Sequence, residues 1–77
     1  MFFKIEKIIH AAKKCLGKRN AIVFYMYYGI NGYTPHTYSE IGEEFNITKE
    51  RVRQILNRSK IKLKKYLQQH KFTEKWK

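Results

Sequence analysis

Apolar residues recur at three- and four-residue steps along most of this chain, a spacing typical of helices with one buried face. The first such stretch predicts a helix that stops near Gly17. Its inward stripe consists of Ile5, Ile8, Ile9, Ala12, Cys15 and Leu16. No stretch shows the period-two alternation that marks a half-buried strand, so the pattern favours a helical fold.

A second predicted helix runs from about Arg19 to Tyr28 and ends at the glycine that follows. Val23 and Met26 are expected to face inward, and Ile22 and Ile30 are further candidates for that face. The next segment, residues 30–36, holds an Asn-Gly pair and a proline, which predict a turn. The Asn-Gly pair would also permit a hairpin, but its flanks lack strand alternation.

Two more helices are predicted on either side of a short break. Thr37-Tyr38-Ser39-Glu40 fits a capping box that starts the third helix, and Asn46 suits a left-handed helix end. Thr48 is a good N-cap for the fourth helix, which would be about 33 Å long if it continues to Gln69. The inner stripe of that helix is Val52, Ile55, Leu56, Ser59, Leu63, Tyr66 and Leu67.

So short a break forces the third and fourth helices to cross at a steep angle, as in a helix-turn-helix. Such a crossing needs a small residue on the first helix, and Gly42 supplies it. Ile47 is expected to plug the turn, while Val52 and Ile55 pack the second helix back on the first. An ordinary helical hairpin in a small bundle is the alternative.

These elements predict an all-α, four-helix domain with a helix-turn-helix, of the winged-helix-like DNA-binding superfamily but without a wing. Residues 1–77 are expected to form a single domain, because that length permits little more. The helix-turn-helix would span about residues 37–69. Residues 71–77 would form a frayed tail that Phe72 and Trp76 could dock.

The charge of the chain indicates the kind of partner it binds. The sequence has 17 Lys and Arg residues and 6 acidic residues, which gives a net charge of +11. That excess points to a polyanionic partner, nucleic acid first and an anionic membrane surface second. The charge is also segregated. Residues 20–48 contain no Lys or Arg, whereas residues 49–65 contain eight of them and one acid.

Polar side chains dominate the start of the fourth helix once Val52 and Ile55 are set aside. They are Lys49, Glu50, Arg51, Arg53, Gln54, Asn57 and Arg58, which suit a major groove. Glu50 can accept from a cytosine amino group, and Gln54 can pair with adenine. A solvated charged face is the alternative, but such a face usually mixes signs at four-residue spacing. Lysines 60, 62, 64 and 65 would add attraction without reading sequence.

Nothing in the sequence indicates an enzyme: it holds no phosphate-binding glycine loop, nucleophile elbow or acid–base pair. His10, His36 and Cys15 lack the spacing of a zinc site, so we expect neither metal nor cofactor. Cys15 is expected to be a buried thiol, and a lone cysteine is consistent with a cytoplasmic location. The basic amphipathic first helix would allow a membrane-surface role, but we expect no membrane partner.

Three runs of residues together resemble a known family: Tyr28-Gly29-Ile30, Thr37-Tyr38-Ser39-Glu40-Ile41-Gly42 and Phe45-Asn46-Ile47-Thr48-Lys49-Glu50-Arg51-Val52-Arg53-Gln54-Ile55. The family is region four, the C-terminal promoter-recognition domain of the sigma-seventy class of bacterial sigma factors. The resemblance covers about Arg19 to Lys65. It implies that the recognition helix reads the minus-thirty-five promoter element, while the earlier helices hold the flap of the RNA polymerase β subunit.

Carried over by position, the resemblance implies three groups of contact residues. The base readers would be Lys49, Glu50 and Gln54. The contacts to the DNA backbone would be Arg19, Arg51 and Arg53, with Thr48, Asn57 and Arg58 as further candidates. The contacts to the polymerase flap would be Val23, Met26, Tyr27 and Ile30.

The sequence also departs from the family. Lys49 stands where primary sigma factors usually have Arg, and lysine lacks the planar fork that pairs with guanine. Tyr25 and Tyr27 replace residues that are often basic. The promoter-melting and core-clamping domain is absent from the 77 residues. We therefore expect a stand-alone region-four protein: half of a split sigma factor with a second sigma-like subunit, a phage-type co-activator, or a polymerase-binding regulator.

Two other functions remain open. An adaptor would occupy the β flap without reading DNA, and the apolar character of Tyr25, Tyr27 and Tyr28 would allow it. A self-sufficient dimeric repressor would instead bind a palindromic site.

Overall fold

The computed structural model describes residues 5–69, and the side chains of residues 5–68. It contains four helices: α1 (Ile5–Cys15), α2 (Lys18–Tyr28), α3 (Tyr38–Phe45) and α4 (Lys49–Gln69). Within those residues there is no strand, so the expected all-α, four-helix fold is confirmed. The predicted docking of Phe72 and Trp76 lies outside the described residues.

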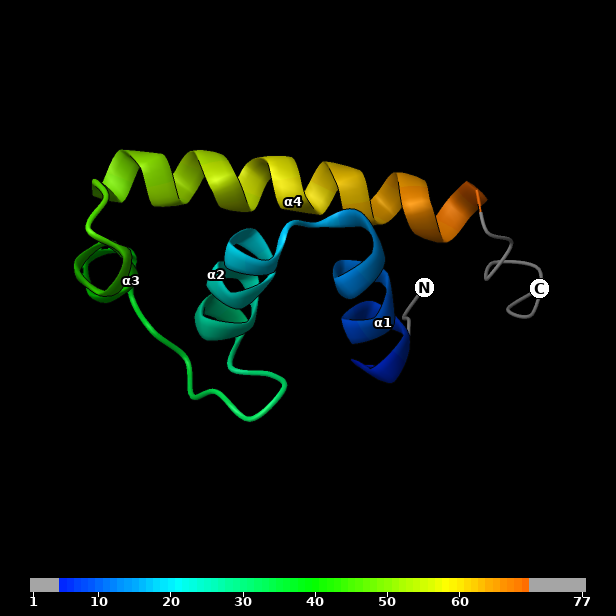
Figure 1. Ribbon diagram of the computed structural model, residues 1–77, viewed down its shortest axis with the longest axis horizontal. Coiled ribbons are helices and arrows are strands. Elements are labelled where there is room, and N and C mark those ends of the chain that lie inside the picture. Colours follow the sequence, from blue (N-terminus) through cyan, green and yellow to red (C-terminus); the bar gives the residue numbers. More distant parts are fainter. Residues whose placement is uncertain (1–4, 70–77) are drawn as a thin grey trace.

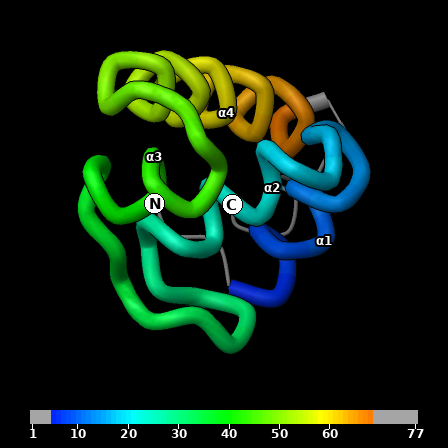
Figure 2. The backbone as a smooth tube through the Cα atoms, turned by 60° about the vertical axis from the view of Figure 1, so that its left-hand side comes forward, coloured from blue at the N-terminus to red at the C-terminus, as the bar shows by residue number. Residues whose placement is uncertain are grey.

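Helix α4 is the central helix of the domain. It runs the length of the molecule as one rod, and α3, α2 and α1 lie one after another along the same side of it (Figure 1). The turned view keeps the three shorter helices on that side (Figure 2). Each of them packs against α4. The helix predicted to read DNA is therefore also the element that holds the other three together.

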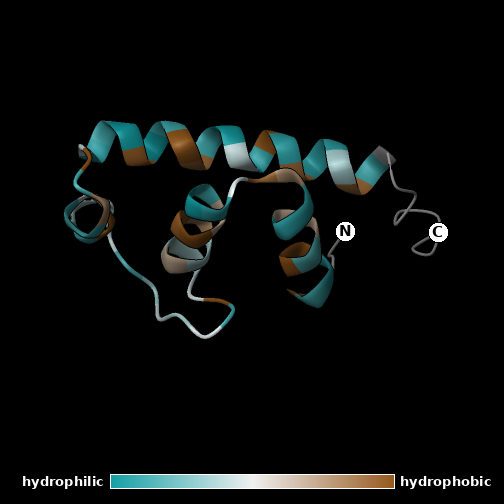
Figure 3. Ribbon diagram, viewed as in Figure 1, coloured by the Kyte–Doolittle hydropathy of each residue, from teal (hydrophilic) through white to brown (hydrophobic). Residues whose placement is uncertain are grey.

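The core lies on the underside of α4. Its buried positions are Val52, Ile55, Leu56, Ser59, Leu63 and Leu67, as the predicted inner stripe requires, and Tyr66 is half-buried. Hydrophobic bands interrupt an otherwise hydrophilic α4 (Figure 3). One stripe at helical spacing thus serves all three short helices.

Helix α2 is buried on most of its circumference because it lies between α3 and α1 and beneath α4 (Figure 1). Ala21, Val23, Phe24, Tyr25 and Met26 are all buried. The inward orientation predicted for Val23 and Met26 is confirmed. A helix surrounded by neighbours has no single polar face, which is why its sequence shows only a weak periodic pattern.

Helix α1 follows its predicted stripe only in part. Ala12 and Leu16 are buried, while Ile8, Ile9 and Cys15 are half-buried. Ile5 is 57% exposed, because the first turn of α1 lies far from α4 (Figure 1).

The first helix stops near Gly17 as predicted, since α1 ends at Cys15, but the expected burial of Cys15 needs correction. Gly17 itself is not left-handed. It has φ −64° and ψ 159° and precedes α2 as its N-cap. Cys15 is half-buried rather than buried, and this partial burial still raises the pKa of its thiol.

The connection from α2 to α3 is shaped by a left-handed glycine and a tight turn. Gly29 has φ +66°, and a Cβ built there would lie 2.6 Å from the Cδ atom of Pro35. Asn31 and Gly32 both have positive φ, and the amide of Tyr33 donates to the carbonyl of Ile30 over 3.2 Å. The Asn-Gly pair therefore forms a turn, and the hairpin alternative is wrong because no described residue on either side is in a strand.

Candidate nucleic-acid interface

The corner between α3 and α4 has the close geometry of a helix-turn-helix. A Cβ on Gly42 would lie 2.6 Å from the carbonyl oxygen of Ile47, so no larger residue fits without a backbone shift. Asn46 ends α3 in the left-handed region at φ 58°, and the Ile47 amide donates to the Gly42 carbonyl over 2.8 Å. Helix α3 is seen nearly end-on where α4 runs across the picture (Figure 1). The steep crossing predicted from the three-residue break is confirmed.

Side chains cap the start of both helices of this motif. The Thr37 hydroxyl accepts from the Glu40 amide over 3.1 Å, and the Glu40 carboxylate accepts from the Thr37 amide over 2.8 Å. The predicted capping box is therefore present. The Thr48 hydroxyl accepts from the Arg51 amide over 3.0 Å at the start of α4. Both caps satisfy amides that would otherwise lack a partner.

The first half of α4 is divided sharply between a core side and a solvent side. Val52, Ile55 and Leu56 are at most 2% exposed. The polar residues Lys49, Glu50, Arg53, Gln54, Asn57 and Arg58 are all exposed, and Arg51 is half-buried. The three residues predicted to read bases, Lys49, Glu50 and Gln54, thus share one open surface, which we call the reading face.

Glu50 and Arg53 are paired on this surface. The Arg53 Nε donates to Glu50 Oε1 over 3.0 Å, and Arg53 Nη2 donates to Glu50 Oε2. The hydrogen bonds from Arg53 hold the pKa of the Glu50 carboxyl below its usual range, and a hydrogen bond from Gln54 acts in the same direction. The carboxylate therefore stays ionised, so it accepts hydrogen bonds rather than donating them.

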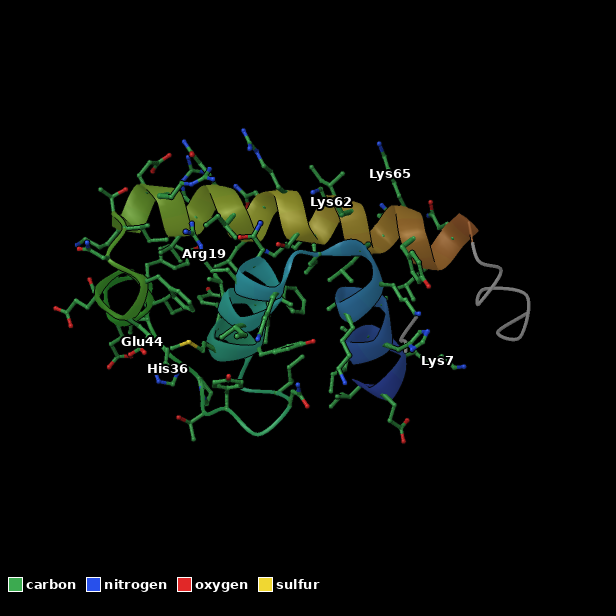
Figure 4. All side chains as sticks on the ribbon, in the orientation of Figure 1. Lys7, Arg19, His36, Glu44, Lys62 and Lys65 are labelled. Carbon is green, nitrogen blue, oxygen red and sulfur yellow. The ribbon has the colours of Figure 1, made fainter. Side chains whose placement is uncertain are left out.

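The predicted backbone contacts are spread over two helices. Arg19, at the start of α2, is exposed and lies below the first half of α4 in the view of Figure 4. Thr48 already uses its hydroxyl as a cap, and Arg53 already uses its guanidinium on Glu50. Asn57 and Arg58 continue the exposed surface one turn further along α4. The sequence predicted the Thr48 cap but not the pairing of Arg53 with Glu50, because side-chain rotamers decide that pairing.

The basic charge continues beyond the reading face. Lys62, Lys64 and Lys65 are exposed, and the side chain of Lys65 points away from the three shorter helices (Figure 4). Lys60 is different, because its Nζ atom lies 5.9 Å from the centre of the Tyr28 ring, within the range of a cation–π contact. A hydrogen bond with Tyr28 raises the pKa of the Lys60 ammonium.

The surface predicted to meet the polymerase needs correction. Val23 is fully buried and Met26 is 6% exposed, so neither can contact a partner in this conformation. Both belong to the core beneath α4, as expected for the inward side of α2. Tyr27 and Ile30 are half-buried. The Tyr27 ring packs edge-on against Tyr28, with centroids 4.9 Å apart, and at 5.3 Å from the Tyr38 ring.

Tyr25 also differs from its expected place on an apolar surface. It is 4% exposed, and its ring stacks against Tyr33 with centroids 6.3 Å apart. Burial raises the pKa of its hydroxyl. Tyr25 is therefore part of the core and offers no contact surface to an adaptor.

An apolar groove that the sequence did not predict lies where α1, α2 and α4 meet. Its volume is about 230 Å³, and it is lined by Ile8, Phe24, Tyr28, Leu63 and Leu67, with Lys60 and Lys64 also on its wall. Tyr28 is 40% exposed there. Ile8, Leu63 and Leu67 belong to predicted helical stripes and Phe24 and Tyr28 do not, so only the packing of the three helices shows that these side chains line one groove.

Among residues 5–69, no three His, Cys, Asp or Glu side chains are grouped so as to hold a metal ion. None of the helices in that range is long and apolar enough to cross a membrane.

Comparison with known proteins identifies the family. Residues 14–65, more than half of the chain, match the family model for sigma-70, region 4. The chain is 40% identical over 55 residues to the chloroplastic RNA polymerase sigma factor sigD of Arabidopsis thaliana, covering 68% of this chain and 13% of that protein. It is 36% identical over 55 residues to RNA polymerase sigma factor RpoD of Neisseria gonorrhoeae, covering 71% of this chain and 9% of that protein.

The chain thus spans only a small part of the length of these two relatives. No solved structure matches it significantly. The matched segment contains α2, α3, the turn and most of α4, which are the elements that build the reading face and its support. On the family match and on the helix-turn-helix geometry together, the chain belongs to the sigma-70 region 4 family.

Proposed function

We propose that this chain recognises a minus-thirty-five-type promoter element through the first turns of α4 while it is bound to RNA polymerase. The observation that supports this most directly is the division of α4. Val52, Ile55 and Leu56 hold one side in the core, and Lys49, Glu50 and Gln54 stand together on the other. A helix braced this way can enter a major groove without unfolding or rearranging.

Each side chain of the reading face can form hydrogen bonds with a particular base in the major groove. The Glu50 carboxylate accepts from the amino group of cytosine, and the Gln54 amide both donates to and accepts from adenine. Lys49 donates to the acceptors of guanine as a point charge, which makes its preference less strict than that of an arginine fork. Arg19, Arg51, Asn57 and Arg58 donate to phosphates and fix the register of the helix.

The polymerase contact belongs to the apolar groove between α1, α2 and α4. Tyr28 is 40% exposed on its wall and Ile8 is half-buried there, whereas Val23 is fully buried and Met26 does not line the groove. We propose that the β flap inserts apolar side chains into this groove and that Lys60 and Lys64 pair with acids beside them. The groove and the reading face lie on different surfaces of α4, so both partners can bind at once.

We propose that the matched segment does not itself melt promoter DNA, since residues 14–65 match region 4 alone and the two relatives are many times longer than the segment they share with this chain. We propose that another polypeptide region, such as a second sigma-like subunit on the same polymerase, supplies the melting activity. The location that follows is the cytoplasm or the compartment that holds the polymerase.

Selection of duplexes from a randomised library, with and without RNA polymerase, tests the DNA-reading proposal. The wild-type protein should enrich one short motif when polymerase is present. The double variant Glu50→Ala, Gln54→Ala should lose that motif. Gln68→Ala is the matched control, because Gln68 is exposed on the same helix and far from the reading face. Enrichment that the double variant leaves unchanged would refute the proposal.

The alternative function is an adaptor that occupies the flap without reading sequence. The apolar groove is the observation that favours it, since the groove needs no DNA to bind a partner. Tyr28→Asp should abolish polymerase capture under both functions, while Ile61→Asp, a change at an apolar residue 57% exposed and outside the groove lining, should not. An unchanged DNA motif in the Glu50, Gln54 double variant, with Tyr28→Asp still inactive, would favour the adaptor.

A further inference from the structure

We infer that Arg53 is a positioning residue that fixes the carboxylate of Glu50 for one base of the target site, rather than a contact to a DNA phosphate. This inference rests on the proposed function and refines it. It replaces the role that the family resemblance implies for Arg53.

The geometry of the pair supports this role. Two nitrogens of the Arg53 guanidinium each donate to one oxygen of the Glu50 carboxylate: Nε donates to Oε1 over 3.0 Å, and Nη2 donates to Oε2. A bidentate pair fixes the plane of the carboxylate as well as its position, which a single contact cannot do. The two residues are three apart on α4, so the helix itself holds them as neighbours.

The pair still leaves Glu50 able to read a base. The side chains of Arg53 and Glu50 are 48% and 58% exposed, so their outer edges face solvent. A carboxylate has about four acceptor positions, of which Arg53 occupies two and the hydrogen bond from Gln54 a third. The remaining position can accept from an amino group in a groove.

Charge gives a second reason for the pair. A lone carboxylate on a helix that enters DNA is repelled by the phosphates on both sides. The guanidinium of Arg53 offsets that charge, and with Gln54 it keeps the pKa of Glu50 below its usual range. Glu50 can therefore enter the groove ionised and already oriented.

A phosphate contact and a positioning role predict different behaviour for Arg53→Lys. Lysine keeps the positive charge, so a phosphate contact would largely survive. Lysine lacks the planar fork, so the bidentate hold on Glu50 would be lost. Arg58→Lys is the matched control. Arg58 is an exposed arginine of the same helix, and the arginine that pairs with Glu50 is Arg53.

The experiment measures the affinity of the full chain, assembled with RNA polymerase, for duplexes changed at each position of the selected motif. The position whose preference Glu50→Gln removes is the Glu50 position. Arg53→Lys should reduce the preference there by roughly tenfold and leave the other positions and the salt dependence unchanged. The double variant Glu50→Gln, Arg53→Lys should lose no more than Glu50→Gln alone.

A different pattern would overturn the inference. If Arg53→Gln weakens binding equally on every duplex and lowers the salt slope, and Arg53→Lys restores both, Arg53 is a phosphate contact. If Arg53→Lys acts like Arg58→Lys at every position, Arg53 does not position Glu50. If the wild-type protein shows no preference at any position, the proposed function itself fails, which is a separate result.

Discussion

Two short connections between helices, α1 to α2 and α3 to α4, look alike in the sequence and differ in the structure. Each has a glycine near it and spans only a few residues. At the first, a Cβ on Gly17 would meet nothing within 4 Å, and the backbone angles are ordinary. At the second, a Cβ on Gly42 would lie 2.6 Å from the Ile47 carbonyl oxygen.

The two connections differ in how closely they fix the angle between the helices that they join. The first joins two helices that each pack against α4 more extensively than against each other. The second sets the angle at which α3 braces the reading face of α4. Close approach of backbone to backbone leaves only one arrangement there, because protein interiors are packed without spare volume.

The largest effect that would test this contrast is expected for Gly42→Ala. Helix propensity alone would favour alanine by about 1 kcal/mol, but the added methyl group pushes against backbone rather than a flexible side chain. We expect a net loss of about 2 kcal/mol or more in the free energy of unfolding, measured by urea denaturation. A domain of this size has only about 3–5 kcal/mol to lose, so DNA binding should fall as well.

Gly17→Ala is the matched control for that substitution. It should change the free energy of unfolding by less than about 1 kcal/mol, because open space surrounds the new methyl group. Equal losses at the two glycines would contradict the contrast between the two connections.

A smaller loss is expected for Thr48→Ala at the same corner. The change removes the acceptor for the Arg51 amide, which now lies 3.0 Å from the Thr48 hydroxyl. Loss of an N-cap costs about 1 kcal/mol. Urea denaturation without DNA measures this effect on its own, and Thr48→Ser should restore most of the stability. No loss in Thr48→Ala would mean that the cap adds nothing to this corner.

Asn46→Ala should cost slightly less. Asn46 has φ 58°, a left-handed conformation that alanine adopts less readily than asparagine. We expect a loss of about 0.5–1 kcal/mol in the thermal or urea unfolding of the variant. Asn46→Gly should be at least as stable as Asn46→Ala, because glycine has no Cβ to clash. The reverse order of the two variants would rule out backbone strain as the cause.

The smallest change in the free energy of unfolding is expected at the connection between α1 and α2, where a substitution should increase stability. Gly17 is the N-cap of α2, and no side chain there accepts from the free amides of that helix. Gly17→Ser would supply such an acceptor and should raise the free energy of unfolding by a few tenths of a kcal/mol. A loss of stability in this variant would show that the connection is as restricted as the corner at Gly42.

Much of the architecture was predictable because it depends on local rules. The capping box at Thr37, the left-handed end at Asn46 and the core stripe of α4 each follow from residue type and spacing. The exposure of Ile5, the burial of Tyr25 and the groove beside Tyr28 could not be predicted in this way. Each depends on which neighbouring helix covers a side chain.

The candidate site divides in the same manner. Helical spacing predicted that Lys49, Glu50 and Gln54 lie on the solvent side of the fourth helix, and all three are exposed there. The pairing of Arg53 with Glu50 and the burial of Val23 and Met26 needed coordinates, because rotamers and helix–helix contacts decide them.

The amino-acid sequence by itself determined four helices, the sharp corner before α4 and the sign and place of the charge. These properties arise from interactions within a few residues of one another, which the order of residues specifies directly. The tertiary structure alone decided which apolar residues remain open to a partner and which polar groups are already paired. Those outcomes depend on segments distant in the chain, whose contacts are set only when the three short helices pack along α4.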